Sequence, residues 1–123
     1  MTNREFIRRI RKAVYEPAVE GSLAILEQPP GRRPCAALLE LSQWFNQLLP
    51  EDKERVRGTM QLAARAAVFE MLAVLDGVTA IREAGEEAGL LELRYSAGGR
   101  SILLNDPTAE PLHDLFAGQV PPP

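Results

Sequence analysis

The residues closest to acid–base chemistry are His113 and Asp114, which are adjacent, and Asp106 a few positions earlier. An imidazole can act as a general base that a carboxylate orients. Neighbouring residues on a helix do not face each other, however, so spacing alone does not create a catalytic pair. We interpret His113 as a surface or half-buried side chain. A small enzyme that uses His113 with nearby carboxylates is the alternative.

Glu70 is a second acid–base candidate because it follows a largely apolar stretch of sequence. Pairing with an arginine such as Arg65, from another element or subunit, is the more ordinary interpretation. Motifs of hydrolases, zinc proteases and phosphate-binding loops are absent, and Cys35 is the only cysteine. We therefore expect a non-enzymatic protein with no metal site, no disulfide and no cofactor.

Two basic segments are candidate anion sites. Arg8 and Arg9 belong to a basic, amphipathic N-terminal segment, and Arg32 and Arg33 precede a predicted helix whose free N–H groups favour anions. Solvated charge is the ordinary interpretation of both segments. An anion or nucleic-acid binder that uses the N-terminal helix is a further alternative, although the net charge of −3 argues against general nucleic-acid binding.

The candidate partner-binding residues are Trp44 and an acidic group around a predicted loop, namely Glu83, Glu86, Glu87 and Glu92. One of the adjacent aromatic residues Trp44 and Phe45 must point away from the helical stripe, although a wide buried face that hides both is the favoured interpretation. An acidic surface can bind a basic enzyme. The function hypothesis is a small protein-interaction module, specifically an immunity- or antitoxin-type inhibitor of bacterial style.

The elements that position these residues are mainly helical. Apolar residues recur at helical spacing from Asn3 to Tyr15, with a stop or kink before Pro17 and a second segment through Leu26. A loop at residues 28–33 precedes a helix opened by Pro34. The longest helix is predicted from Glu51 to about Asp76.

That longest helix carries apolar residues on two sides. One stripe contains Met60, Ala64, Ala67 and Met71, and a second contains Leu62, Ala66, Phe69 and Ala73. A short chain has little material to cover both stripes, so we expect a homodimer, with another protein as a further partner. Charged residues interrupt the apolar stretch, so we expect neither a membrane span nor export, and we place the protein in the cytoplasm.

The C-terminal part predicts a β-hairpin, formed by residues 90–95 and 100–104 around a Ser-Ala-Gly-Gly turn. Pairing Tyr95 with Arg100 places Leu93 opposite Ile102. A short helix follows from Pro111 to Ala117. The predicted class is α+β, mainly α-helical: a helical core with a C-terminal β-hairpin and a short terminal helix, in a single domain of residues 1–117 with a disordered proline-rich tail at 118–123.

Overall fold

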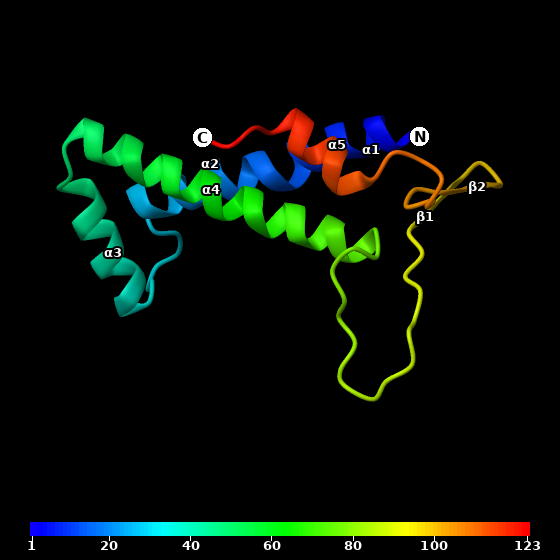
Figure 1. Ribbon diagram of the computed structural model, residues 1–123. Coiled ribbons are helices and arrows are strands. Elements are labelled where there is room, and N and C mark those ends of the chain that lie inside the picture. Colours follow the sequence, from blue (N-terminus) through cyan, green and yellow to red (C-terminus); the bar gives the residue numbers. More distant parts are fainter.

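The computed structural model describes residues 1–123 and confirms the mainly helical α+β class (Figure 1). The elements in chain order are α1 (Asn3–Ile10), the π-helical turn η1 (Arg11–Tyr15), α2 (Glu16–Glu27), α3 (Ala36–Asn46), α4 (Pro50–Leu75), β1 (Arg94–Ala97), β2 (Arg100–Leu103) and α5 (Leu112–Gln119). The two strands pair with each other and with no other strand.

The first helical run is continuous from α1 through α2, with the π turn in its middle. Pro17 lies in the first turn of α2 and explains this turn. A proline donates no backbone hydrogen bond and crowds the carbonyl group four residues earlier, and a π turn accommodates such a local interruption. The hydroxyl of Thr2, rather than the side chain of Asn3, caps the helix by accepting a hydrogen bond from the Glu5 amide.

α4 has 26 residues and is bounded close to the predicted positions. Pro50 occupies its first turn, where a missing N–H group costs nothing, and Glu51 and Asp52 complement the positive end of the helix dipole. α3 begins at Ala36, two residues later than Pro34 would place it, because Cys35 has an extended backbone and serves as its N-cap.

α4 packs against two separate apolar clusters. At its C-terminal end, Phe69, Leu72 and Leu75 contact a cluster built mainly from α1 and α5, whose fully buried members include Ile7 and Phe116. Towards its N-terminal end, α4 contacts a second cluster from α2 and α3, which contains Val19, Leu23, Leu26 and Phe45. α4 therefore joins the two apolar clusters into one molecule.

The predicted hairpin forms, but β1 spans Arg94–Ala97 rather than residues 90–95, and the register differs. Ala97 pairs with Arg100 and Tyr95 pairs with Ile102, so the pairing of Tyr95 with Arg100 is wrong. The turn contains two residues, Gly98 and Gly99, and both have positive φ angles (59° and 74°). Two glycines of this kind match the twist of a tight hairpin, which is why the four-residue loop does not form.

α5 extends two residues beyond the predicted end of the domain, to Gln119. The next residue, Val120, is 4% exposed and belongs to the cluster of α1 and α5. Its carbonyl oxygen accepts a hydrogen bond of 2.6 Å from Nε of Arg65 on α4. The packed part of the chain therefore reaches Val120, and the three terminal prolines follow it.

Two parts of the molecule project from opposite ends of α4 (Figure 1). α3 extends from the N-terminal end, and the segment from Gly77 to Glu92, which we name the acidic loop, extends from the C-terminal end. Both projections point away from α5, which runs along the other side of α4. Between them, α4 is left without a covering element.

Candidate functional site

The uncovered side of α4 is apolar. We define the open face as Leu62, Ala63, Ala66, Ala67, Glu70 and Met71, all of which are exposed. Leu62 is 56% exposed and Met71 is 59% exposed, whereas Leu72 on the other side is 4% exposed. At 100° per residue the open face lies roughly opposite the packed side of α4. The open face takes residues from both predicted stripes, Ala67 and Met71 from one and Leu62 and Ala66 from the other, so part of each stripe is left uncovered.

α3 also exposes one large aromatic side chain. Phe45 is buried at 2% exposure, with Lys53 above its ring at 5.4 Å, whereas the adjacent Trp44 is 51% exposed. The favoured prediction of a wide buried face is wrong, because α3 packs against α2 through one narrow side that includes Ser42 and Phe45. Trp44 is instead available for contact, as the partner-binding hypothesis requires.

The acidic loop exposes further apolar residues. Val78, Ile81 and Leu90 are each more than half exposed. The base of the loop borders a cavity of about 440 Å³, whose apolar lining includes Leu91 and Leu103. Only 13 of the 123 residues are buried, which is few for a chain of this length and leaves much apolar surface in contact with solvent.

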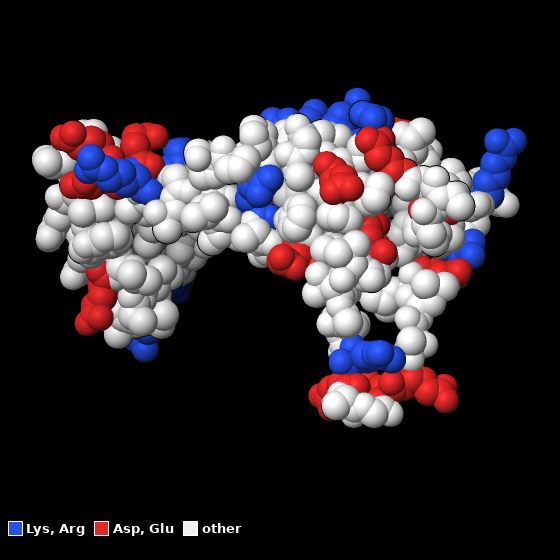
Figure 2. All heavy atoms as spheres, viewed as in Figure 1, with Lys and Arg blue, Asp and Glu red and all other residues white.

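The acidic residues predicted for partner binding gather on this loop, and Figure 2 shows acidic atoms concentrated at the tip of the projection. Glu86 accepts a hydrogen bond of 3.0 Å from the backbone amide of Glu83, so its side chain shapes the turn. Glu87 is exposed, and Glu92 forms an ion pair of 3.2 Å with Arg94 nearer the hairpin. The loop thus presents negative charge beside apolar side chains.

The candidate anion residues do not form one site. Arg9 donates to Glu5 at 2.5 Å, and Arg8 lies 3.9 Å from the same carboxylate. The hydrogen bond and the charge of Arg9 hold the pKa of Glu5 below its ordinary value. Arg32 and Arg33 are exposed in the bend before α3, at the other end of the chain's first helical region. One carboxylate, that of Glu5, therefore offsets part of the positive charge of Arg8 and Arg9.

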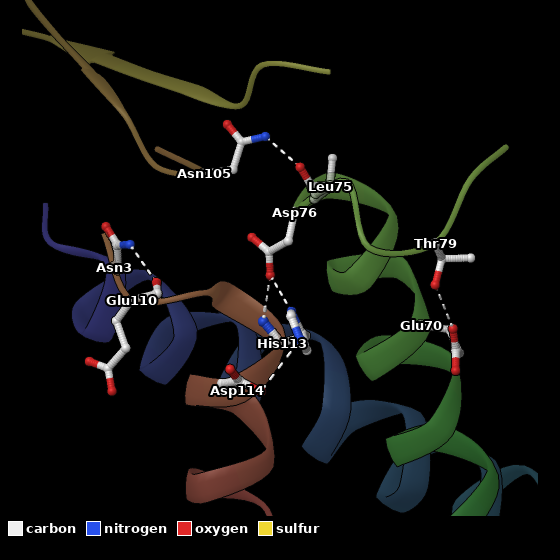
Figure 3. A network of polar contacts seen from close by, with 9 residues as sticks. All are labelled: Asn3, Glu70, Leu75, Asp76, Thr79, Asn105, Glu110, His113 and Asp114. Atoms are coloured by element: carbon white, nitrogen blue, oxygen red, sulfur yellow. Dashed lines mark hydrogen bonds and ion pairs between the residues drawn. The ribbon is translucent and has the colours of Figure 1, made fainter. Parts of the chain in front are cut away.

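His113 belongs to a different arrangement, shown in Figure 3. Its Nδ1 lies 2.6 Å from Oδ2 of Asp76, and its backbone amide donates to the same oxygen at 2.9 Å. Its ring packs edge-on against Phe69, with ring centres 5.4 Å apart, and Nε2 lies 3.4 Å from Asp114. Asp76 at the end of α4 thereby caps the start of α5.

The other carboxylates predicted to work with His113 have their own partners. Asp106 accepts hydrogen bonds from the backbone amide and hydroxyl of Thr108, which lower the pKa of Asp106. Glu70 accepts a hydrogen bond of 3.3 Å from Thr79 (Figure 3). From the sequence, Asp76 is predicted only as a residue at the end of a helix. No local pattern could reveal its contact with His113, which is 37 positions away.

A second cavity of about 440 Å³ borders the π turn. Its polar lining includes Arg11, Glu16 and Gln61, and Arg11 forms an ion pair of 3.1 Å with Glu16 across its edge. No sequence pattern predicts this cavity, although Pro17 marks the irregular turn beside it. His113 lines neither of the two main cavities. No group of three His, Cys, Asp or Glu side chains is arranged to hold a metal ion.

By length and composition alone, α4 could also cross a membrane, since its most apolar 18-residue window has a mean hydropathy of 1.3 and is only 11% buried. Arg65 and Glu70 lie in the apolar part of the helix. Comparison with known proteins finds no matching family model, no similar curated protein and no similar solved structure.

Proposed function

We propose that this protein is a non-enzymatic interaction module, which binds a partner polypeptide through the open face of α4 together with α3 and the acidic loop. The observation that carries the proposal is the exposure of apolar side chains on all three elements, including Trp44, Leu62 and Ile81. A large amount of exposed apolar surface on a small chain is costly in water and is typical of protein-binding sites. Tryptophan is also among the residues that contribute most to binding energy.

The charge of the acidic loop supports a partner that carries basic residues. Glu83, Glu86 and Glu87 lie at its tip, so they would contact positive groups at the rim of an interface and orient the partner. An immunity- or antitoxin-type inhibitor that occludes a basic enzyme is a narrower form of the same proposal. The net charge of −3 favours a protein over nucleic acid as the partner.

Two contacts favour binding over catalysis or membrane insertion. Asp76 uses one carboxylate oxygen for both contacts to His113, which is the geometry of a helix cap, and His113 lines neither of the two main cavities. In the middle of α4, Arg65 is hydrogen-bonded to the end of α5. Inserting α4 into a bilayer would break this hydrogen bond and would expose the cluster that α4 shares with α1 and α5.

A site-specific photocrosslinker in place of Trp44 tests the proposal in the producing cell. We expect irradiation to give a covalent adduct with a polypeptide, because Trp44 lies on the proposed binding surface. A matched variant carries the crosslinker at Ala18, an exposed position on α2, and should give little adduct. Equal labelling at the two positions, or no polypeptide adduct at Trp44, would contradict the proposal.

A further inference from the structure

We propose that the polypeptide covering the open face is a second copy of this chain, packed with its α4 antiparallel to the first around a two-fold axis. This inference rests on the proposed function and takes the partner to be a second copy of the chain, in place of a separate basic enzyme. A two-fold interface is self-complementary, so each feature on one half must meet its complement when the two ends of α4 are exchanged. The charges and residue sizes along α4 satisfy this condition.

One exposed stripe of α4 has a residue pattern that is nearly symmetric about its midpoint, with opposite charges at its two ends. At 100° per residue, Arg55, Thr59, Leu62, Ala63, Ala66 and Glu70 lie within one 100° sector of the helix. An antiparallel copy centred between Leu62 and Ala63 brings Arg55 opposite Glu70 and Thr59 opposite Ala66. The two-fold axis creates the ion pair twice, with opposite charges at both ends of the contact.

The middle of this stripe suits close helix packing. Thr59, Ala63 and Ala66 are small, so two helix backbones can approach to the 8–10 Å at which helices pack. Leu62 is the one large apolar residue near the proposed axis, and it would be buried against the partner's Ala63. Leu62 of each helix therefore fits into the space left by the small side chain of Ala63 on the other helix.

The two ends of the stripe can form their ion pairs without large rearrangement. Arg55 now donates to Asp52 at 2.5 Å, and its side chain is 76% exposed. Glu70 accepts only from the hydroxyl of Thr79. An exposed ion pair of this kind contributes little stability, so Arg55 can exchange or share its partner at small cost.

The two projections of the molecule carry complementary charges as well. Arg32 and Arg33 precede α3, at the end of α3 that lies farthest from α4 in Figure 1. Glu83, Glu86 and Glu87 belong to the other projection, the acidic loop, together with Arg82, and Figure 2 shows acidic atoms beside basic ones at its tip. In the antiparallel arrangement the basic projection of one copy meets the acidic projection of the other, on both sides of the axis.

Light scattering after size exclusion, followed by analytical ultracentrifugation over a range of concentrations, tests the inference. The wild-type chain should have twice the subunit mass at high concentration. Ala66→Arg places a long charged side chain at the helix contact and should yield monomers with unchanged far-ultraviolet circular dichroism, because Ala66 is exposed in one subunit. Ala18→Arg on α2, the matched control, should remain dimeric.

Reversing the charge at Arg55 or at Glu70 tests the antiparallel orientation of the two α4 helices. Arg55→Glu alone and Glu70→Arg alone each create like-charge pairs on both sides of the axis and should raise the dimer dissociation constant about tenfold or more. Mixing the two single variants should restore dimers, because each variant then supplies the charge that the other needs. Recovery on mixing cannot arise from misfolded variants.

A wild-type chain that stays monomeric at every concentration overturns self-association and leaves the proposed function standing if Trp44 still crosslinks to a different polypeptide. A dimer that survives Ala66→Arg, or single variants that fail to recover on mixing, overturns the antiparallel α4 interface. If α4 instead carries the chain to neutral phosphatidylcholine vesicles in a flotation assay, a membrane covers the open face and the inference is wrong.

Discussion

The two sides of α4 differ in what they contact, although both are apolar. On the packed side, Leu72 is 4% exposed and lies among residues from α1 and α5. On the open face, Met71, the adjacent residue in the chain, is 59% exposed. Apolar residues on the packed side stabilise the fold, and we propose that the apolar residues that the fold leaves uncovered serve in binding.

The largest expected difference is in stability. Phe116→Ala empties a fully buried position and should lower the free energy of unfolding by about 3–5 kcal/mol. Leu62→Ala on the open face should lower it by less than about 0.5 kcal/mol in the monomer, since this side chain is already exposed. Urea unfolding at low protein concentration measures both. Equal losses would show that the two sides of α4 do not differ in this way.

A somewhat smaller effect is expected at the polar contact on the packed side. Asp76→Ala removes the acceptor for the backbone and the ring of His113, and it should destabilise the protein by about 1–3 kcal/mol. Asp76→Asn keeps an acceptor oxygen and should lose less. Thermal unfolding of the two variants compares them, and an Asp76→Ala protein as stable as wild type would contradict the capping role.

Two glycines should respond in opposite directions. Gly58 lies inside α4 and an added Cβ would meet no atom within 4 Å, so Gly58→Ala should stabilise the protein by about 0.5–1 kcal/mol. Gly77 follows α4 with a φ of +78°, so Gly77→Ala should destabilise it by about 1 kcal/mol. Urea midpoints measured side by side give the signs, and two shifts of the same sign would contradict this expectation.

The smallest effect concerns pH. The pKa of Asp106 is lowered in the folded protein by its hydrogen bonds from Thr108, so its carboxylate contributes stability above its unfolded pKa of about 3.9. This contribution is lost as the pH falls through the lower, folded value. Asp106→Asn should therefore flatten the acid limb of the stability profile, measured by urea unfolding between pH 7 and pH 2. An unchanged acid limb would show that Asp106 is not among the groups responsible.

The sequence predicted most helices because their signals are local. Prolines and apolar spacing placed α4 within one residue of its observed bounds at each end. The hairpin register failed for a specific reason: moving the pairing by two positions leaves the same side chains on each face. Only the positive φ angles of Gly98 and Gly99 distinguish the tight turn from the longer one.

The candidate site was partly predictable. Two apolar stripes on α4 indicated more apolar surface than a short chain covers, and the structure leaves one side uncovered. The sequence could not show that Trp44 faces solvent, because adjacent aromatic residues allow either a broad or a narrow buried side. It also could not show that Asp76 contacts His113, since that contact depends on how α4 and α5 pack.

Asn105 connects the two ends of the acidic loop by hydrogen bonds. Its side-chain amide donates to the carbonyl groups of Leu75 and Leu91, and its Oδ1 accepts from the amide of Leu93. Asn105 lies outside the loop, and its hydrogen bonds hold the beginning and the end of the loop close together. Residues of the loop between these two ends can be exchanged or inserted at modest entropic cost, since doubling a loop's length costs only about 0.6 kcal/mol. Mutation can therefore change the surface that the loop presents while the helices beneath it keep their packing.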